Sequence, residues 1–129
     1  DKATIVTDTG VISDDVLRRI DDTTLLVLEA NYDPHMLRFG PYQPFLKQRV
    51  ASDEGHLSNE MAAQALLMMK RPDFMQVILA HRSENNNNAV LVTQTIGKML
   101  VDGGVRIGPE MKLQHGQPNE IVSIQSVER

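Results

Sequence analysis

The order of the apolar segments constrains this chain most, because three of them are each followed by a polar loop and a stretch with helical spacing. These segments are residues 3–7, 23–29 and 75–81. The last two contain runs of consecutive apolar residues, which are typical of strands covered on both faces, as in a parallel sheet. Parallel neighbours need right-handed crossovers, which the helical stretches supply. The sequence therefore predicts an α/β fold, and 129 residues are enough for a single domain, residues 1–129.

Residues that cap helices mark where the helical stretches begin. Ser13 and Ser58 are predicted to cap two of them, and Asn88 can cap a third. Between residues 31 and 54, prolines and a glycine interrupt two short helical pieces, and a long irregular segment of this kind is more often functional than structural. Residues 105–127 predict one or two further strands.

Composition excludes several kinds of protein. The chain has no cysteine, which excludes disulfides, thiolate zinc sites and a cysteine nucleophile. Its net charge of −4 gives no global attraction to nucleic acid or anionic lipid, so a phosphate-bearing substrate must be held by a local site. The longest apolar runs are about half of the ~20 residues that a membrane span requires, and no signal-peptide pattern is present. These features predict a cytoplasmic protein with no membrane partner.

Chemically useful side chains stand at the predicted carboxyl ends of the three strands. Asp8 follows the first strand, residues 29–31 end the second and His81 ends the third. Ligands of open parallel sheets bind beyond this edge, and a carboxylate beside an imidazole suits zinc or manganese. Taken singly, Asp8 is more typical of a turn and His81 of a hydrogen-bonded structural histidine. Two other histidines, His35 and His115, lie in predicted loops and are expected at the surface.

His56 immediately precedes the helix that begins at Ser58. The free N–H groups of a helix start favour an anion, and a histidine beside an anion can donate a proton to a leaving oxygen. The alternative is a histidine in a structural turn. Arg38, Lys47 and Arg49 are expected either to form a small basic strip over this site or to be ordinary solvated charges.

Five strings of the sequence carry a further signal between about residue 2 and residue 88. They are Thr7-Asp8-Thr9-Gly10, Glu29-Ala30-Asn31-Tyr32-Asp33, Met36-Leu37-Arg38-Phe39-Gly40-Pro41-Tyr42, Ser52-Asp53-Glu54-Gly55-His56-Leu57-Ser58-Asn59-Glu60 and His81-Arg82-Ser83-Glu84-Asn85-Asn86. In this order they resemble the metallo-β-lactamase fold, and most closely its WalJ/YycJ branch of bacterial metal-dependent hydrolases. Ribonuclease Z is a more distant relative.

The resemblance implies roles for individual residues. Asp8 is expected to bridge two divalent metal ions, zinc or manganese, and His81 to be the last histidine ligand of one of them. His56 is expected to contact the scissile phosphate or protonate the leaving group. The substrate-binding pocket is expected to include Asn31, Ser58 and Asn59. The expected activity is cleavage of phosphodiester bonds in DNA, as an exonuclease.

The main metal-binding motif of that fold, His-x-His-x-Asp-His, does not occur in this sequence. The resemblance therefore predicts the C-terminal half of a four-layer αββα sandwich, with one mixed sheet and helices on one face. Two ligands cannot hold two metal ions, which need roughly four to six donors each. We expect the chain alone to be inactive, and its open sheet face to be covered by the missing N-terminal half or by a homodimer mate.

Two other functions are compatible with the same residues. A hydrolase of a small ester, thioester or lactam could use the same fold. A non-catalytic interaction module could have kept the fold and lost the metal. Retention of Asp8, His56 and His81 favours an enzyme over the module, and the string around His56 together with Arg38 favours phosphate over a neutral ester.

Overall fold

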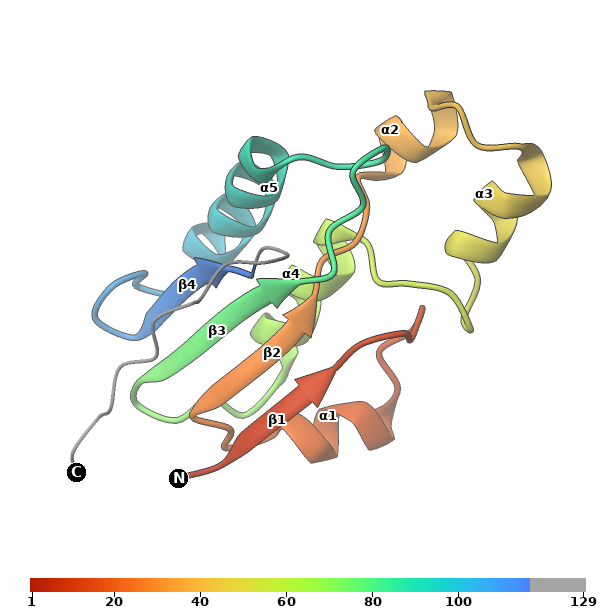
Figure 1. Cartoon of the computed structure of the whole chain (residues 1–129). Helices are drawn as coiled ribbons and strands as arrows, with labels where there is room; N and C mark the ends of the chain where they lie inside the picture. Colours follow the sequence, from red (N-terminus) through yellow and green to blue (C-terminus); the bar gives the residue numbers. More distant parts are fainter. Residues whose placement is uncertain (117–129) are drawn as a thin grey trace.

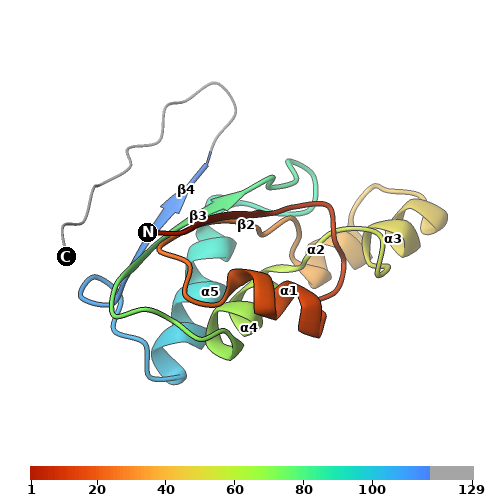
Figure 2. The same cartoon turned by 90° about the horizontal axis from the view of Figure 1, so that it is seen from below.

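The computed structural model describes residues 1–116, which form one parallel sheet with helices packed against one of its faces (Figures 1 and 2). The strands lie in the order β1-β2-β3-β4, and every neighbouring pair is parallel. Their bounds are β1 Ala3–Val6, β2 Leu25–Glu29, β3 Met75–Ala80 and β4 Met111–His115. The helices are α1 Asp14–Ile20, α2 Pro34–Phe39, α3 Pro44–Val50, α4 Asn59–Met68 and α5 Ala89–Asp102.

The predicted helix starts are confirmed. Ser13, Ser58 and Asn88 are the N-caps of α1, α4 and α5, and each side chain accepts a hydrogen bond from a backbone N–H of the first turn. The irregular segment contains the two short helices α2 and α3, each with proline in its first turn. Sequence signals that act within one turn therefore located these elements correctly.

The expectation of a mixed sheet is wrong for residues 1–116. Helices α1, α4 and α5 lie on the connections between successive strands, so each strand returns in the same direction as its neighbour. β4 accounts for one strand of the predicted C-terminal region. The remainder of that prediction, from residue 117 onward, lies outside the described residues.

The helices cover only one sheet face, as predicted (Figure 2). On that face Leu26, Leu28 and Val77 are buried against Leu66 of α4 and Ile96 of α5. On the opposite face, alternate strand residues are less covered: Ile5 is exposed, and Leu25, Val27 and Ile78 are half-buried. No helix within residues 1–116 packs on this second face, and none of them is long and apolar enough to cross a membrane.

Helices α2 and α3 occupy a different place from the other three. They extend past the carboxyl ends of β1, β2 and β3, away from the core (Figures 1 and 2). The same edge of the sheet carries the residues that follow each strand. The fold therefore gathers the strand-end loops and the α2–α3 segment around one rim of the molecule.

Candidate metal centre

Four ligand-type side chains converge at this rim. Asp8, Glu29, His56 and His81 each offer one ligand atom, and these atoms all lie within 4.8 Å of one another. Asp8, Glu29 and His81 come from the carboxyl ends of β1, β2 and β3, whereas His56 comes from the loop between α3 and α4. The structure thus brings together the three predicted residues and adds Glu29, which the sequence analysis placed at the end of the second strand without assigning it a role.

Glu29 is the fully buried centre of the cluster. Its Oε1 contacts Nδ1 of His56 at 2.8 Å and also Nδ1 of His81, and its Oε2 accepts the backbone N–H groups of Asp8 at 3.2 Å and Leu57 at 3.4 Å. An ionised carboxylate has about four acceptor positions, and all are used here. Glu29 therefore holds the other members in place, and its Oε1 lies where the ligand atoms of the cluster converge.

The contacts of Glu29 also orient the two imidazoles. Nδ1 of each ring faces Oε1 of Glu29, and the same nitrogens lie 3.7 Å (His56) and 3.6 Å (His81) from Oδ1 of Asp8. Histidines that bind metals are usually held in a fixed orientation by neighbouring carboxylates. The two rings meet edge to face with their centroids 5.0 Å apart. Both therefore have the arrangement of a ligand or of a proton donor.

Asp8 and His81 share an uncommon backbone conformation. Their φ angles are 59° and 55°, in the left-handed region that non-glycine residues rarely occupy. The side chain of Asn31 donates a 2.7 Å hydrogen bond to the carbonyl of His81 and so supports this turn. Side-chain exposure is 71% for Asp8 and 50% for His81. These two residues are therefore the accessible members of the cluster, turned out of their strands at a cost in backbone strain.

Close backbone contacts place the loop that carries His56. Gly10 donates a 2.9 Å hydrogen bond to the carbonyl of Asp53, and a Cβ at Gly10 would lie 1.7 Å from the carbonyl oxygen of Ser52. At Gly55 a Cβ would lie 2.2 Å from the carbonyl oxygen of Arg49. Only glycine fits at these two positions without moving the backbone. The turn after Asp8 and the loop before His56 are thereby pressed together.

The residues predicted to bind substrate differ in their surroundings. Asn31 lines a pocket of about 340 Å³ together with His56 and His81. Ser58 and Asn59 are buried: the Ser58 hydroxyl caps α4, and the Asn59 amide forms two hydrogen bonds with the Asn87 amide. A substrate-binding role for Ser58 and Asn59 stays a prediction, and their burial favours a role in holding the loop of His56.

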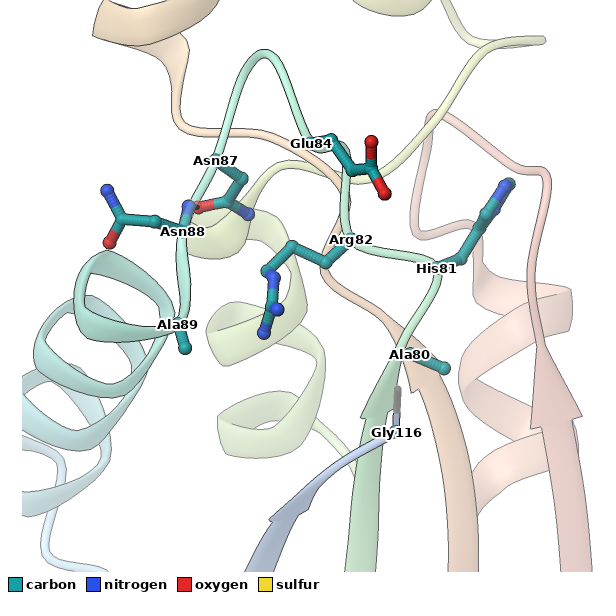
Figure 3. Close-up of a pocket in the computed structure, with 8 residues that line it drawn as sticks. All are labelled: Ala80, His81, Arg82, Glu84, Asn87, Asn88, Ala89 and Gly116. Atoms are coloured by element: carbon teal, nitrogen blue, oxygen red, sulfur yellow. Dashed lines mark hydrogen bonds between the residues drawn. The ribbon is translucent and has the colours of Figure 1, made fainter. Parts of the chain in front are cut away.

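Further pockets adjoin the cluster on both sides. One of about 410 Å³ is lined by Asp8 and His56 together with Leu46 and Arg49 of the α3 region. Another of about 560 Å³ lies between the loop after β3 and the start of α5 (Figure 3). There the Arg82 side chain reaches into the space in front of α5, whereas His81 points toward the opposite side. The cluster thus has open space on either side.

Two titratable residues near this rim have shifted pKa values. Burial, followed by the charge of Glu60, raises the pKa of Tyr32. Burial, followed by the charge of Arg82, lowers the pKa of His115. His115 was expected in a surface loop, and the loop assignment is wrong: it ends β4, where it is half-buried and contacts the Thr93 hydroxyl at 2.9 Å. His35 is exposed as expected, but it lies in helix α2 and not in a loop.

Two curated proteins are similar in sequence to this chain along most of its length. The chain is 33% identical over 126 residues to "Exodeoxyribonuclease YycJ" of Bacillus anthracis, a match that covers 98% of this chain and 48% of that protein. It is 34% identical over 115 residues to "Exodeoxyribonuclease WalJ" of Streptococcus pneumoniae, covering 89% of this chain and 43% of that protein. The chain is a YycJ/WalJ homologue. It spans just under half the length of these relatives.

Two other comparisons add nothing to this relationship. No family model matches this chain, and no solved structure matches it. The metallo-β-lactamase fold therefore remains an expectation carried by the resemblance. The structure of this chain establishes an α/β domain with a parallel sheet and a cluster of carboxylates and imidazoles at one rim.

The cluster of this chain fits part of a divalent metal site. Oxygen and imidazole nitrogen donors suit zinc or manganese. Asp8, Glu29, His56 and His81 are the possible ligands. Four groups are fewer than two ions require, at roughly four to six donors each. The cluster within residues 1–116 is therefore suitable but insufficient for a two-metal centre.

Proposed function

We propose that this chain forms one half of the active site of a metal-dependent phosphodiester hydrolase that acts on DNA as an exonuclease. The observation that carries this proposal is the convergence of Asp8, His56 and His81 around the buried Glu29. The names of the two relatives supply the substrate class. The proposal also makes the chain the C-terminal half of an αββα metallo-β-lactamase fold.

In this proposal Asp8 and His81 hold the metal. Their exposed ligand atoms leave room for donors from outside the chain to complete the coordination. Two divalent ions bound there would polarise the phosphoryl oxygens and activate a water molecule. The chain contributes by fixing where Asp8 and His81 lie. Glu29 provides this through the Asp8 backbone N–H and the His81 ring.

His56 is the proposed general acid. Its Nδ1 donates to Glu29, which keeps the proton to be transferred on Nε2 and stabilises the charged ring before transfer. The ring is then ready to protonate the leaving oxygen of a scissile phosphodiester. Asn31 lines the same pocket, where one N–H of its amide donates to the His81 carbonyl and the second N–H is available to a phosphate. We therefore propose that Asn31 positions His81.

The open sheet face is the second part of the proposal. We expect residues outside this chain, in the missing N-terminal half, to cover Ile5 and its neighbours on β2 and β3. At about 25 cal/mol per Å² of apolar surface, leaving this face in water costs several kcal/mol. Residues 1–129 expressed alone should therefore associate with themselves or with the complementary half, as measured by size-exclusion chromatography with light scattering. A stable, well-folded monomer would contradict this expectation.

The two competing functions have less support. Hydrolysis of a small ester, thioester or lactam is not favoured, because both relatives are named exodeoxyribonucleases. A non-catalytic module has no need for a buried glutamate that orients two histidines toward an exposed aspartate. Neither alternative explains the cluster as simply as a nuclease does.

Replacement of His56 by alanine tests the general-acid role. In the complete gene product we expect metal content to stay unchanged and kcat on DNA to fall by about 10²-fold or more, since general acids contribute roughly that much. A bis(p-nitrophenyl) phosphate substrate provides the control. Its nitrophenolate leaves without protonation, so the same variant should lose far less activity on it. Equal losses on both substrates, or no loss on DNA, would make His56 a structural residue.

A further inference from the structure

The segment from Pro34 to Ser52, here called the α2–α3 arm, has an unusual composition for this chain. It contains three basic residues, Arg38, Lys47 and Arg49, and no aspartate or glutamate, although the whole chain has a net charge of −4. It also contains three of the five Phe and Tyr residues, which are Phe39, Tyr42 and Phe45. Cations and aromatic rings are thus concentrated in one acid-free segment.

The arm holds its aromatic rings in solvent. Phe39 is 70% exposed and Phe45 62% exposed, and the arm extends beyond the sheet instead of packing into the core (Figure 1). The Phe39 ring packs edge to face with His35, and the guanidinium carbon of Arg38 lies 5.4 Å from the ring centroid. The Lys47 ammonium donates a 2.7 Å hydrogen bond to the Arg38 carbonyl, which joins α3 to α2. Burial in the domain therefore does not explain these rings.

The arm is also a wall of the candidate site. Leu46 and Arg49 line the pocket that contains Asp8 and His56. Tyr42 lines the pocket that contains His56, His81 and Asn31. A polymer whose end lies at the cluster can therefore continue directly along the arm.

We propose that the α2–α3 arm binds single-stranded DNA and guides it to the cluster, with Phe39 and Phe45 stacking on bases and Arg38, Lys47 and Arg49 contacting phosphates. This inference rests on the DNA substrate of the proposed function. Single strands are bound by this combination of aromatic stacking and positive charge, since every base has a π-face and every linkage a negative charge. A docking surface for an apolar protein segment would need the rings but not the three cations.

Binding of a labelled oligonucleotide tests the stacking role. We would measure fluorescence anisotropy of dT20 with phosphorothioate linkages, which slow cleavage, bound to the metal-loaded complete gene product. Phe39→Ala and Phe45→Ala should each weaken binding about 5- to 150-fold, as expected for loss of one stacked base. Phe→Tyr at either position should restore most of the affinity. Val90→Ala, which removes an equally exposed apolar side chain from α5, should change nothing.

Salt dependence tests the phosphate contacts separately. Loss of three phosphate contacts on a single strand decreases the magnitude of the negative slope of log K against log salt by about 2, at ~0.7 for each contact. The triple variant Arg38→Gln, Lys47→Gln and Arg49→Gln should show this decrease. An unchanged slope would overturn the assignment of the three cations to the DNA backbone.

Phe→Leu variants distinguish DNA from a protein partner on the same surface. Leucine keeps an apolar side chain but cannot stack, so on a DNA platform it should be as weak as alanine. Unchanged affinity in the alanine variants would overturn the proposal. A second outcome would also overturn it: the leucine variants keep full affinity while the alanine variants have a lowered melting temperature. That result would show that the rings contact protein. If the wild type binds dT20 through Phe39 and Phe45 but cleaves no DNA, the proposed function fails while the platform stands.

Discussion

Replacing Asp8 by alanine is expected to abolish DNA hydrolysis by the complete gene product while the protein remains folded. The carboxylate of Asp8 is 71% exposed and is the accessible acid of the cluster. Loss of an outer partner of a metal ligand costs about 10–100-fold in activity or metal affinity, and loss of the ligand itself should cost more. His81→Ala should have the same effect. Both are measured as kcat on end-labelled DNA with saturating divalent metal.

The backbone of Asp8 requires matched controls. Because its φ is 59°, alanine at this position adds strain that aspartate and asparagine tolerate better. Asp8→Asn keeps the turn and removes the charge, so it should be equally inactive with little change in melting temperature. Asp22 has the same conformation, with φ 60°, outside the cluster, and Asp22→Ala should retain activity. Normal turnover in the Asp8 or His81 variants would remove the site assignment.

The second large effect is expected at Glu29. Four donors face its carboxylate, from the rings of His56 and His81 and the backbones of Asp8 and Leu57. Glutamine has one acceptor oxygen and an NH2 group, so about half of these donors would meet another donor. An unsatisfied buried group costs about 1–3 kcal/mol. Glu29→Gln should therefore both lower the free energy of unfolding and disorder the two histidines.

Two measurements follow the loss of Glu29. The melting temperature should fall by several degrees, at about 2–8 °C per kcal/mol for a domain of this size. Nitrogen-15 NMR of the imidazoles should show Nδ1 protonated in both rings of the wild type and mixed tautomers in Glu29→Gln. Activity should fall with the loss of ring order. A variant with wild-type melting temperature, tautomers and rate would show that Glu29 is not the centre of this site.

Local signals in the sequence predicted much of this structure. The N-caps Ser13, Ser58 and Asn88 depend on hydrogen bonds within a single turn, so their residue types were enough. Asp8 and His81 were predicted to share an edge because parallel strands end at the same edge of a sheet. Both conclusions required only the order of elements and general rules of topology.

Features that depend on tertiary contacts were not predicted. Glu29 ends an apolar strand, which was a visible signal, but its role arises from full burial beneath two rings that are 27 and 52 residues away in sequence. The environment of His115 depends on α5, where Thr93 contacts its ring. Ser58 and Asn59 lie beside the site in sequence, yet helix capping and the contact with Asn87 turn their side chains inward. Proximity in sequence therefore predicted where the site lies but not which side chains face it.

Anomalous diffraction from a manganese-loaded crystal of the complete gene product tests the central claim most directly. The account predicts an anomalous peak about 2.0–2.3 Å from a carboxylate oxygen of Asp8 and from a ring nitrogen of His81, with further ligands supplied by residues outside 1–129. Full manganese occupancy at a place that touches neither Asp8 nor His81 would contradict the account.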